Sequence, residues 1–313
     1  MTRPLPDDLA ALRAGGKRAL AATLSALETD AAAPRLAALL DAALAEGTGV
    51  ALGLTGPPGV GKSTLVNALI ARVRARGQTV GVIAVDPSSR RSGGALLGDR
   101  TRIETDPEDR GVFVRSMAAR RRLGGLADIT YPAMTLMRAV FDLVIVETVG
   151  VGQSETEIGD VADLVVFCAQ PGSGDALQFM KAGVMEVPDV VLVTKGDLGL
   201  PARRAAADLR GALSLAAGNG PAPDVSIVSA LDGTGVDAAL DRIAARMAAA
   251  PDAPARRRAQ GRAWAEARIA DSFGSVGLAA LGPRIAASPS PFQAVARLLE
   301  AGRRAVHDCL KEV

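Results

Sequence analysis

The sequence has 313 residues, 49% of them hydrophobic and 22% charged, with a formal net charge of +2. This length allows one full-sized α/β domain with smaller additions. The nearly balanced charge and the aromatic content of only 3% argue against nucleic acid and membrane surfaces as partners. The two cysteines, Cys168 and Cys309, do not make a disulfide framework. There is no apolar run of the ~20 residues that a membrane span needs and no apolar segment typical of a secretory signal, so we expect a cytoplasmic protein.

The pattern of apolar residues divides the chain. Residues 1–48 are rich in Ala and Leu at helical spacing and are expected to form an N-terminal helical extension of two or three helices. In residues 49–250, short apolar runs alternate with helical stretches. The predicted strands cover residues 50–56, 79–86, 111–117, 141–148, 163–170, 189–195 and 224–230. Most are apolar throughout, as are strands buried on both faces of a parallel sheet. The prediction is an α/β fold with a three-layer, doubly wound, mainly parallel sheet, typical of P-loop NTPases.

Residues 251–313 contain no predicted strand. Helices are expected around 255–272 and 291–311, and the stretch between them, 274–291, is rich in Gly, Pro and Ser. A helical arm of this kind packs either on its own core or on a second protomer. We therefore predict a third segment, a C-terminal helical arm, beside the P-loop domain.

The run GPPGVGKS at 56–63 matches the phosphate-loop pattern G-x-x-x-x-G-K-[ST] between a predicted strand and a predicted helix. Glycines let main-chain N–H groups converge on phosphate oxygens, and the start of the following helix adds a partial positive charge. In such loops the lysine, here Lys62, reaches the β- and γ-phosphates, and the hydroxyl of Ser63 ligates Mg²⁺. The candidate phosphate contacts are Gly56, Pro57, Pro58, Gly59, Val60, Gly61, Lys62, Ser63 and Thr64.

Two further motifs favour guanine over adenine. Thr194-Lys195-Gly196-Asp197 ends a predicted strand and is similar to the GTPase base motif [NT]-K-x-D, with Thr194 where Asn is usual. The Asp197 carboxylate can accept N–H bonds from the guanine edge, whereas adenine would leave it unpaired. Ser229, Ala230 and Leu231 end the next strand, where GTPases carry a loop that contacts the guanine carbonyl.

Three acidic residues are candidates for the magnesium shell. Asp86 ends the second predicted strand, Asp99 follows in a Gly-rich loop, and Glu147 ends the fourth strand. Mg²⁺ retains several waters, so not all three can be direct ligands. The polar segment 87–103 suits a loop that becomes ordered on the γ-phosphate.

The segment GVGQSE at 150–155 suits a second switch, in which the N–H of Gly150 binds the γ-phosphate. Val151 occupies the position directly after this glycine, where Ras-type enzymes carry the water-orienting Gln. The group that positions the attacking water therefore stays open, with Gln153 as the first candidate and Asp86 or Asp99 as the alternatives. Slow intrinsic hydrolysis is expected.

Together these motifs resemble the MeaB/ArgK family of GTPases. The resemblance covers most of the chain and is specific, because other GTPase groups lack the pair formed by the second and third of these motifs. Its carriers are TGPPGVGKST (55–64), VDPSSRRSGGALLGDRTRI (85–103), VETVGVGQSE (146–155), QPGSGDALQFMKAG (170–183) and TKGD (194–197).

The resemblance implies a cytoplasmic, homodimeric GTPase that uses GTP and Mg²⁺. Its expected partner is an adenosylcobalamin-dependent acyl-CoA mutase, such as methylmalonyl-CoA mutase or a close relative, whose cofactor loading it gates and which it protects. It also implies a further switch at 171–181, in which Asp175 and Lys181 take part. Which mutase is served cannot be read from the sequence.

Two other functions remain as alternatives. A nickel-insertion GTPase shares this class of fold, but such proteins carry His-rich or Cys/His tracts, and this chain has one histidine, His307, and no CxxC pair. A P-loop kinase or transport ATPase would prefer ATP and would have no use for the TKGD motif.

Overall fold

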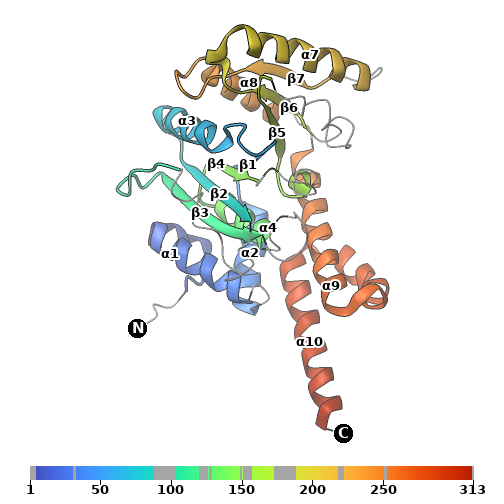
Figure 1. Ribbon diagram of the computed structural model, residues 1–313. Coiled ribbons are helices and arrows are strands. Elements are labelled where there is room, and N and C mark those ends of the chain that lie inside the picture. Colours follow the sequence, from blue (N-terminus) through green and yellow to red (C-terminus); the bar gives the residue numbers. More distant parts are fainter. Residues whose placement is uncertain are drawn as a thin grey trace. The chain divides into compact units, whose positions relative to one another are not determined.

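The structure is a computed structural model, and it describes residues 5–30, 33–87, 103–119, 126, 129–148, 150, 157–172, 188–217, 222–249 and 252–311 (Figure 1). The chain divides into two compact units. One, here called the sheet unit, comprises 49–130 and 141–251, and the other, the helical unit, comprises 1–48, 131–140 and 252–313. The helical unit thus combines both ends of the sequence with a short segment from its middle.

The described part of the sheet unit forms one seven-stranded sheet in the order β3-β2-β4-β1-β5-β6-β7. Its strands are β1 (Val50–Thr55), β2 (Val80–Pro87), β3 (Val112–Ala119), β4 (Leu143–Glu147), β5 (Leu164–Ala169), β6 (Val190–Val193) and β7 (Asp224–Ile227). Every neighbouring pair is parallel. The seven predicted strands and their parallel arrangement are therefore confirmed.

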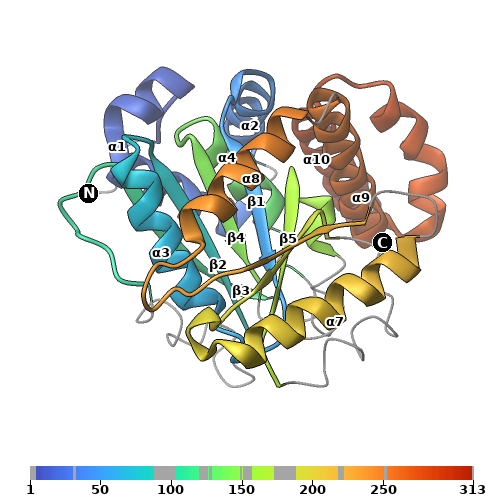
Figure 2. The ribbon, with the colours of Figure 1, turned by 90° about the horizontal axis from the view of Figure 1, so that it is seen from above.

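Helices cover both faces of this sheet. Leu52 and Leu54 of β1 lie in one core cluster with Leu65 and Leu69 of α3 (Lys62–Ala75), and this cluster also takes in the buried side of α8 (Val236–Ala249). Figure 2 shows α3 and α8 on the same face of the strands. On the opposite face, Val191 of β6 packs with the buried side of α7 (Leu200–Ala217). The three-layer prediction is confirmed, and the fully apolar strands are explained by burial on both sides.

Aspartates stand directly before three of the strands, at the amino edge of the sheet. The carboxylate of Asp163 accepts the N–H of Ala51 at 2.8 Å, and that of Asp189 accepts the N–H of Val165 at 2.8 Å. Asp142 likewise accepts the N–H and hydroxyl of Thr79, both at 2.8 Å. These carboxylates satisfy main-chain donors of the neighbouring strand, so the amino edge is closed by the chain itself.

The helical unit is built from α1 (Leu9–Asp30), α2 (Pro34–Glu46), α4 (Thr130–Arg138, of which residue 131 onward belongs here), α9 (Ala253–Ala286) and α10 (Pro291–Lys311). Tyr131, Trp264 and Phe292 form an aromatic cluster with ring centroids 4.6–6.3 Å apart. Asp41 of α2 accepts the first free N–H groups of α10, from Phe292 at 3.2 Å and Gln293 at 3.0 Å. This carboxylate caps α10 in the way that short polar side chains cap helices, although its burial raises its pKa.

The interpretation of 274–291 as a break between two helices was wrong over most of its length. The helix α9 continues to Ala286 with one non-helical residue, Gly274 (φ 70°, ψ −172°), and it contains Pro283. An interior proline costs ~3 kcal/mol, but Ile285 is only 1% exposed and joins Ala265 and Ile269 in a hydrophobic cluster. Burial of apolar side chains of this kind contributes about 1.5–3 kcal/mol each, which offsets the proline. No described helix is both long and apolar enough to cross a membrane.

Candidate nucleotide-binding site

The phosphate loop joins β1 to α3 at the carboxyl edge of the sheet. Gly56, Gly59 and Gly61 all have positive φ, at 136°, 75° and 97°. A Cβ on Gly56 would lie 2.2 Å from the carbonyl oxygen of Cys168, whereas a Cβ on Gly59 or Gly61 would meet nothing within 4 Å. The first glycine therefore lets the loop pack on β5, and the other two give it its curvature while leaving open space above it. The Val60 side chain is fully buried.

Lys62 is the first residue of α3, and its side chain lies over the loop. The residue is only 6% exposed, and its Nζ donates to the carbonyl oxygens of Gly56 at 2.7 Å and Pro57 at 3.1 Å. Gly150 (φ 87°) closes over the same point, since a Cβ there would lie 2.7 Å from Nζ and 2.1 Å from the Gly56 oxygen. A buried ammonium group beside the unpaired N–H groups of a helix start attracts an anion. The arrangement can hold a phosphate.

Ser63 and Glu147 bring two oxygen ligands together next to Lys62. The Ser63 hydroxyl donates to Oε1 of Glu147 at 2.8 Å, and Glu147, the last residue of β4, is 5% exposed. Thr148 follows it, with its hydroxyl donating to that of Thr55 at 3.0 Å. A hydroxyl and a carboxylate are ligands that suit Mg²⁺. These two of the predicted metal ligands therefore lie within reach of one ion.

The thiol of Cys168 lies buried beneath this cluster. Burial raises its pKa to about 12, the Glu147 carboxylate raises it further, and the Lys62 ammonium acts in the opposite direction. The group is a neutral part of the core at neutral pH and supplies no nucleophile.

The base motif follows β6 and touches the phosphate loop. The Thr194 hydroxyl is 2.7 Å from the carbonyl oxygen of Val60 and 3.0 Å from that of Ala169. Lys195 has the left-handed conformation (φ 55°, ψ 42°), and its Nζ donates to the carbonyl oxygen of Gly59 at 3.2 Å and to Oε1 of Gln170. Two side chains of the base motif thus brace the phosphate loop, and the hydroxyl at 194 provides one of these contacts.

The carboxylate of Asp197 lies at the junction of the base motif with the loop after β7. The Ser229 hydroxyl donates to its Oδ1 at 3.0 Å, and the N–H of Gly196 donates to the carbonyl of Val228 at 2.9 Å. Ser229 is fully buried, while Leu231 is 82% exposed. The serine holds the carboxylate in place, and a flat apolar side chain stands free beside it. This is the geometry that reading of a purine edge requires.

The site residues predicted from the sequence are thus brought together wherever the structure describes them. The main chain of Asp86 is the seventh residue of β2, beside β4 at the same edge, and its side chain lies outside the described residues. The predicted residues Asp99, Gln153, Asp175 and Lys181 also lie outside them. Sequence reasoning missed Gln170, the partner of Lys195. Its signal was its place directly after a buried strand, at the edge where the other polar site residues gather.

The parallel sheet, the phosphate loop and the base motif braced against it define the protein as a P-loop GTPase. The family model described as "Methylmalonyl Co-A mutase-associated GTPase MeaB" matches residues 19–278. The chain belongs to this family, which confirms the resemblance drawn from its motifs.

Relatives and a solved structure agree with this family. A Pyrococcus horikoshii GTPase is 45% identical over 196 residues, 62% of either chain. The mitochondrial methylmalonic aciduria type A homolog of Mus musculus is 38% identical over 221 residues, 68% of this chain and 53% of its own. The alignments thus span less than two thirds of these relatives. A crystal structure entitled LAO/AO transport system kinase matches with a TM-score of 0.63 at 26% identity, over 93% of this chain and 96% of the other.

Proposed function

We propose that this chain binds Mg²⁺ and GTP at the carboxyl edge of its sheet and hydrolyses GTP to GDP and phosphate, slowly when alone. The observation that carries the proposal is the Lys62 ammonium, held at 2.7 and 3.1 Å on two carbonyls of a glycine loop with open space above it. Carbonyl dipoles are weak partners for a buried cation compared with phosphate oxygens. The strongest partner for this group is therefore a ligand.

The chain's own residues have distinct roles in this proposal. The N–H groups of the loop and of the start of α3 bind the phosphates, and Lys62 neutralises charge that develops on them. Ser63 and Glu147, whose oxygens are 2.8 Å apart, would hold the Mg²⁺ ion. When bound, this ion bridges the β- and γ-phosphates and offsets their charge. Gly150 would donate its N–H to the γ-phosphate.

Discrimination for guanine is assigned to Asp197, with the Ser229-Ala230-Leu231 loop beside the base. The Ser229 hydroxyl occupies one carboxylate oxygen, which leaves lone pairs for two N–H groups of guanine. Adenine lacks these donors, so its binding would leave the acceptor without a partner.

We further propose that the nucleotide state is passed to an adenosylcobalamin-dependent acyl-CoA mutase, whose cofactor loading the protein gates. The family description, which names methylmalonyl-CoA mutase, supports this proposal. In it, Asp86, Asp99 and Gln153 complete the metal and water positions, and Asp175 and Lys181 signal to the mutase. The protein acts in the cytoplasm as a homodimer through the arm 251–313, beside the extension 1–48 and the GTPase domain 49–250.

The two alternatives predict different ligands. The related structure with a transport-kinase title raises ATP as a substrate, and the contacts of Asp197 and Lys195 favour guanine instead. A nickel-insertion role needs a soft-metal site, and the described residues hold no group of three or more His, Cys, Asp or Glu able to bind a metal ion. We therefore favour the mutase-linked GTPase.

Capture of cobalamin mutases tests the partner. The immobilised chain is incubated with purified methylmalonyl-, ethylmalonyl- and isobutyryl-CoA mutases, each with GDP, with a non-hydrolysable GTP analogue, or with neither. We expect one mutase to be retained to an extent that changes with the nucleotide. Retention of none, or retention that is equal in all three conditions, would refute the partner while leaving the GTPase proposal untouched.

A further inference from the structure

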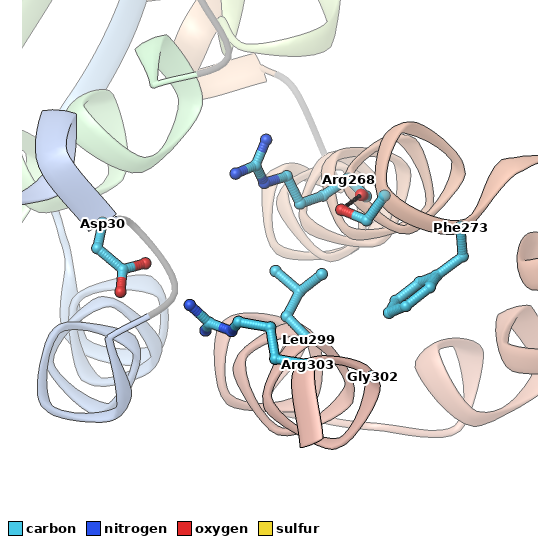
Figure 3. Close-up of a pocket in the computed structure, with 7 residues that line it drawn as sticks. Asp30, Arg268, Phe273, Leu299, Gly302 and Arg303 are labelled. Carbon is cyan, nitrogen blue, oxygen red and sulfur yellow. Dashed lines mark hydrogen bonds between the residues drawn. The ribbon is translucent and has the colours of Figure 1, made fainter. Parts of the chain in front are cut away.

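A cavity of about 450 Å³ lies within the helical unit, between the end of α1 and the helices α9 and α10 (Figure 3). Its walls carry Asp30, Arg268, Phe273, Leu299 and Arg303, with Ser272 and Gly302 beside them. This volume lies in the range of small-molecule sites. Every lining residue belongs to the helical unit, so the cavity is separate from the nucleotide site.

The apolar wall is built by a helix break and a glycine. Phe273 directly precedes Gly274, the one non-helical residue inside α9. The ring rests on Gly302 of α10, where a Cβ would lie 2.5 Å from ring atoms Cε1 and Cζ. Leu299 stands one turn before Arg303 on the same face of α10, and both Phe273 and Leu299 pack at the edge of a buried cluster. The shape of this wall therefore depends on two glycines.

The polar wall carries more positive than negative charge. Figure 3 shows the guanidinium groups of Arg268 and Arg303 on the side of Leu299 that faces Asp30, and the Phe273 ring on the other side. Two guanidinium groups and one carboxylate leave one net positive charge. The nearby Ser272 hydroxyl donates to the main-chain carbonyl of Arg268 at 2.9 Å. Guanidinium groups recognise carboxylate and phosphate through paired N–H donors.

We propose that this cavity binds a small organic anion with an apolar body, of the class that includes medium-chain carboxylates and alkyl phosphates. The anionic group lies between Arg268 and Arg303, and the apolar body lies along Leu299 and the Phe273 ring. An uncharged molecule of the same shape gains only the apolar contact, and a bare anion gains only the charged one. This function goes beyond nucleotide binding and does not depend on it.

Displacement of a fluorescent anion tests the proposal on the full chain without nucleotide. The reporter is 8-anilinonaphthalene-1-sulfonate, whose fluorescence rises in apolar sites, and the competitors are octanoate, octyl phosphate and 1-octanol. We expect at least one anion to displace the reporter at about tenfold lower concentration than the alcohol. The stronger of the two anions identifies the head group. Equal potency of the alcohol and both anions would overturn the proposal.

Variants locate the binding. Arg303→Gln should weaken the stronger anion about tenfold, and Asp30→Asn should strengthen it because a competing negative charge is removed. The matched control is Arg304→Gln, the next residue of α10, whose guanidinium pairs with Glu300 and does not line the cavity. Melting curves confirm that each variant is folded. Equal effects of the two arginine variants would refute the assignment.

Sedimentation distinguishes the ligand from a second copy of the chain. The proposal predicts that Arg303→Gln leaves the oligomeric state as it is. If this variant changed the sedimentation coefficient while its affinity for the anions stayed at the wild-type value, the cavity would be the seat of another protomer and the proposal would be wrong.

Discussion

The two edges of the central sheet both carry polar residues, and they use them differently. At the amino edge, Asp163 and Asp189 stand directly before strands, and each accepts a main-chain N–H of the neighbouring strand at 2.8 Å. At the carboxyl edge, Lys62 is held on carbonyl oxygens at the mouth of a glycine loop. Charges at the first edge find their best partners within the chain, while the charge at the second edge has a better partner in a phosphate. Function is therefore assigned to the edge whose polar groups the fold does not fully use.

Replacement of Lys62 by Ala gives the largest expected effect. Loss of this charge next to the developing phosphate charge should lower the GTP hydrolysis rate by about 10³-fold, while thermal unfolding changes little because no buried acceptor loses an obligatory donor. Phosphate release and a melting curve measure the two quantities. Hydrolysis at the wild-type rate would remove the carboxyl edge from the mechanism.

Asp197→Asn tests base recognition at the same edge. The variant should bind GTP about 10- to 100-fold more weakly, because hydrogen bonds to a charged group are worth about 1.5–3 kcal/mol. Ser229 can still donate to the amide oxygen, so the loop should keep its shape. The control is Asp232→Asn in the neighbouring loop, whose carboxylate accepts the N–H of Thr234 and which should bind GTP normally. Equal affinities of both variants would place base recognition elsewhere.

Asp163→Ala tests the amino edge, where the opposite outcome is expected. The N–H of Ala51 would lose its buried acceptor, at a cost of about 1–3 kcal/mol in the free energy of unfolding. GTP affinity of the folded protein should stay unchanged. Denaturant unfolding with parallel nucleotide titration measures both quantities. A variant that kept its stability but lost nucleotide binding would contradict the division between the edges.

Gln170→Ala should have the smallest effect. It removes the acceptor that holds the Lys195 ammonium near the Gly59 carbonyl, and a neutral contact of this kind contributes about 1 kcal/mol. GTP should bind about fivefold more weakly. Gln170→Glu keeps an acceptor and adds an attractive charge, so it should restore the affinity. Failure of Glu to restore it would mean that Gln170 acts only through packing.

Much of this molecule could be predicted from its sequence, because the signals are local. The apolar runs define all seven strands, and the phosphate loop is a contiguous motif whose spacing fixes its geometry. The role of Gln170 could not be predicted, since its contact with Lys195 joins residues 25 positions apart. The continuation of α9 through Pro283 was missed for a related reason. Burial of Ile285 against a distant part of the same helix overrides local propensity.

Titration calorimetry with non-hydrolysable nucleotides tests the central claim most directly. In the presence of Mg²⁺, the account predicts that the wild-type chain binds the GTP analogue at one site and binds the matching ATP analogue at least about 100-fold more weakly. Equal affinity for the two analogues, or no heat with either, would contradict it.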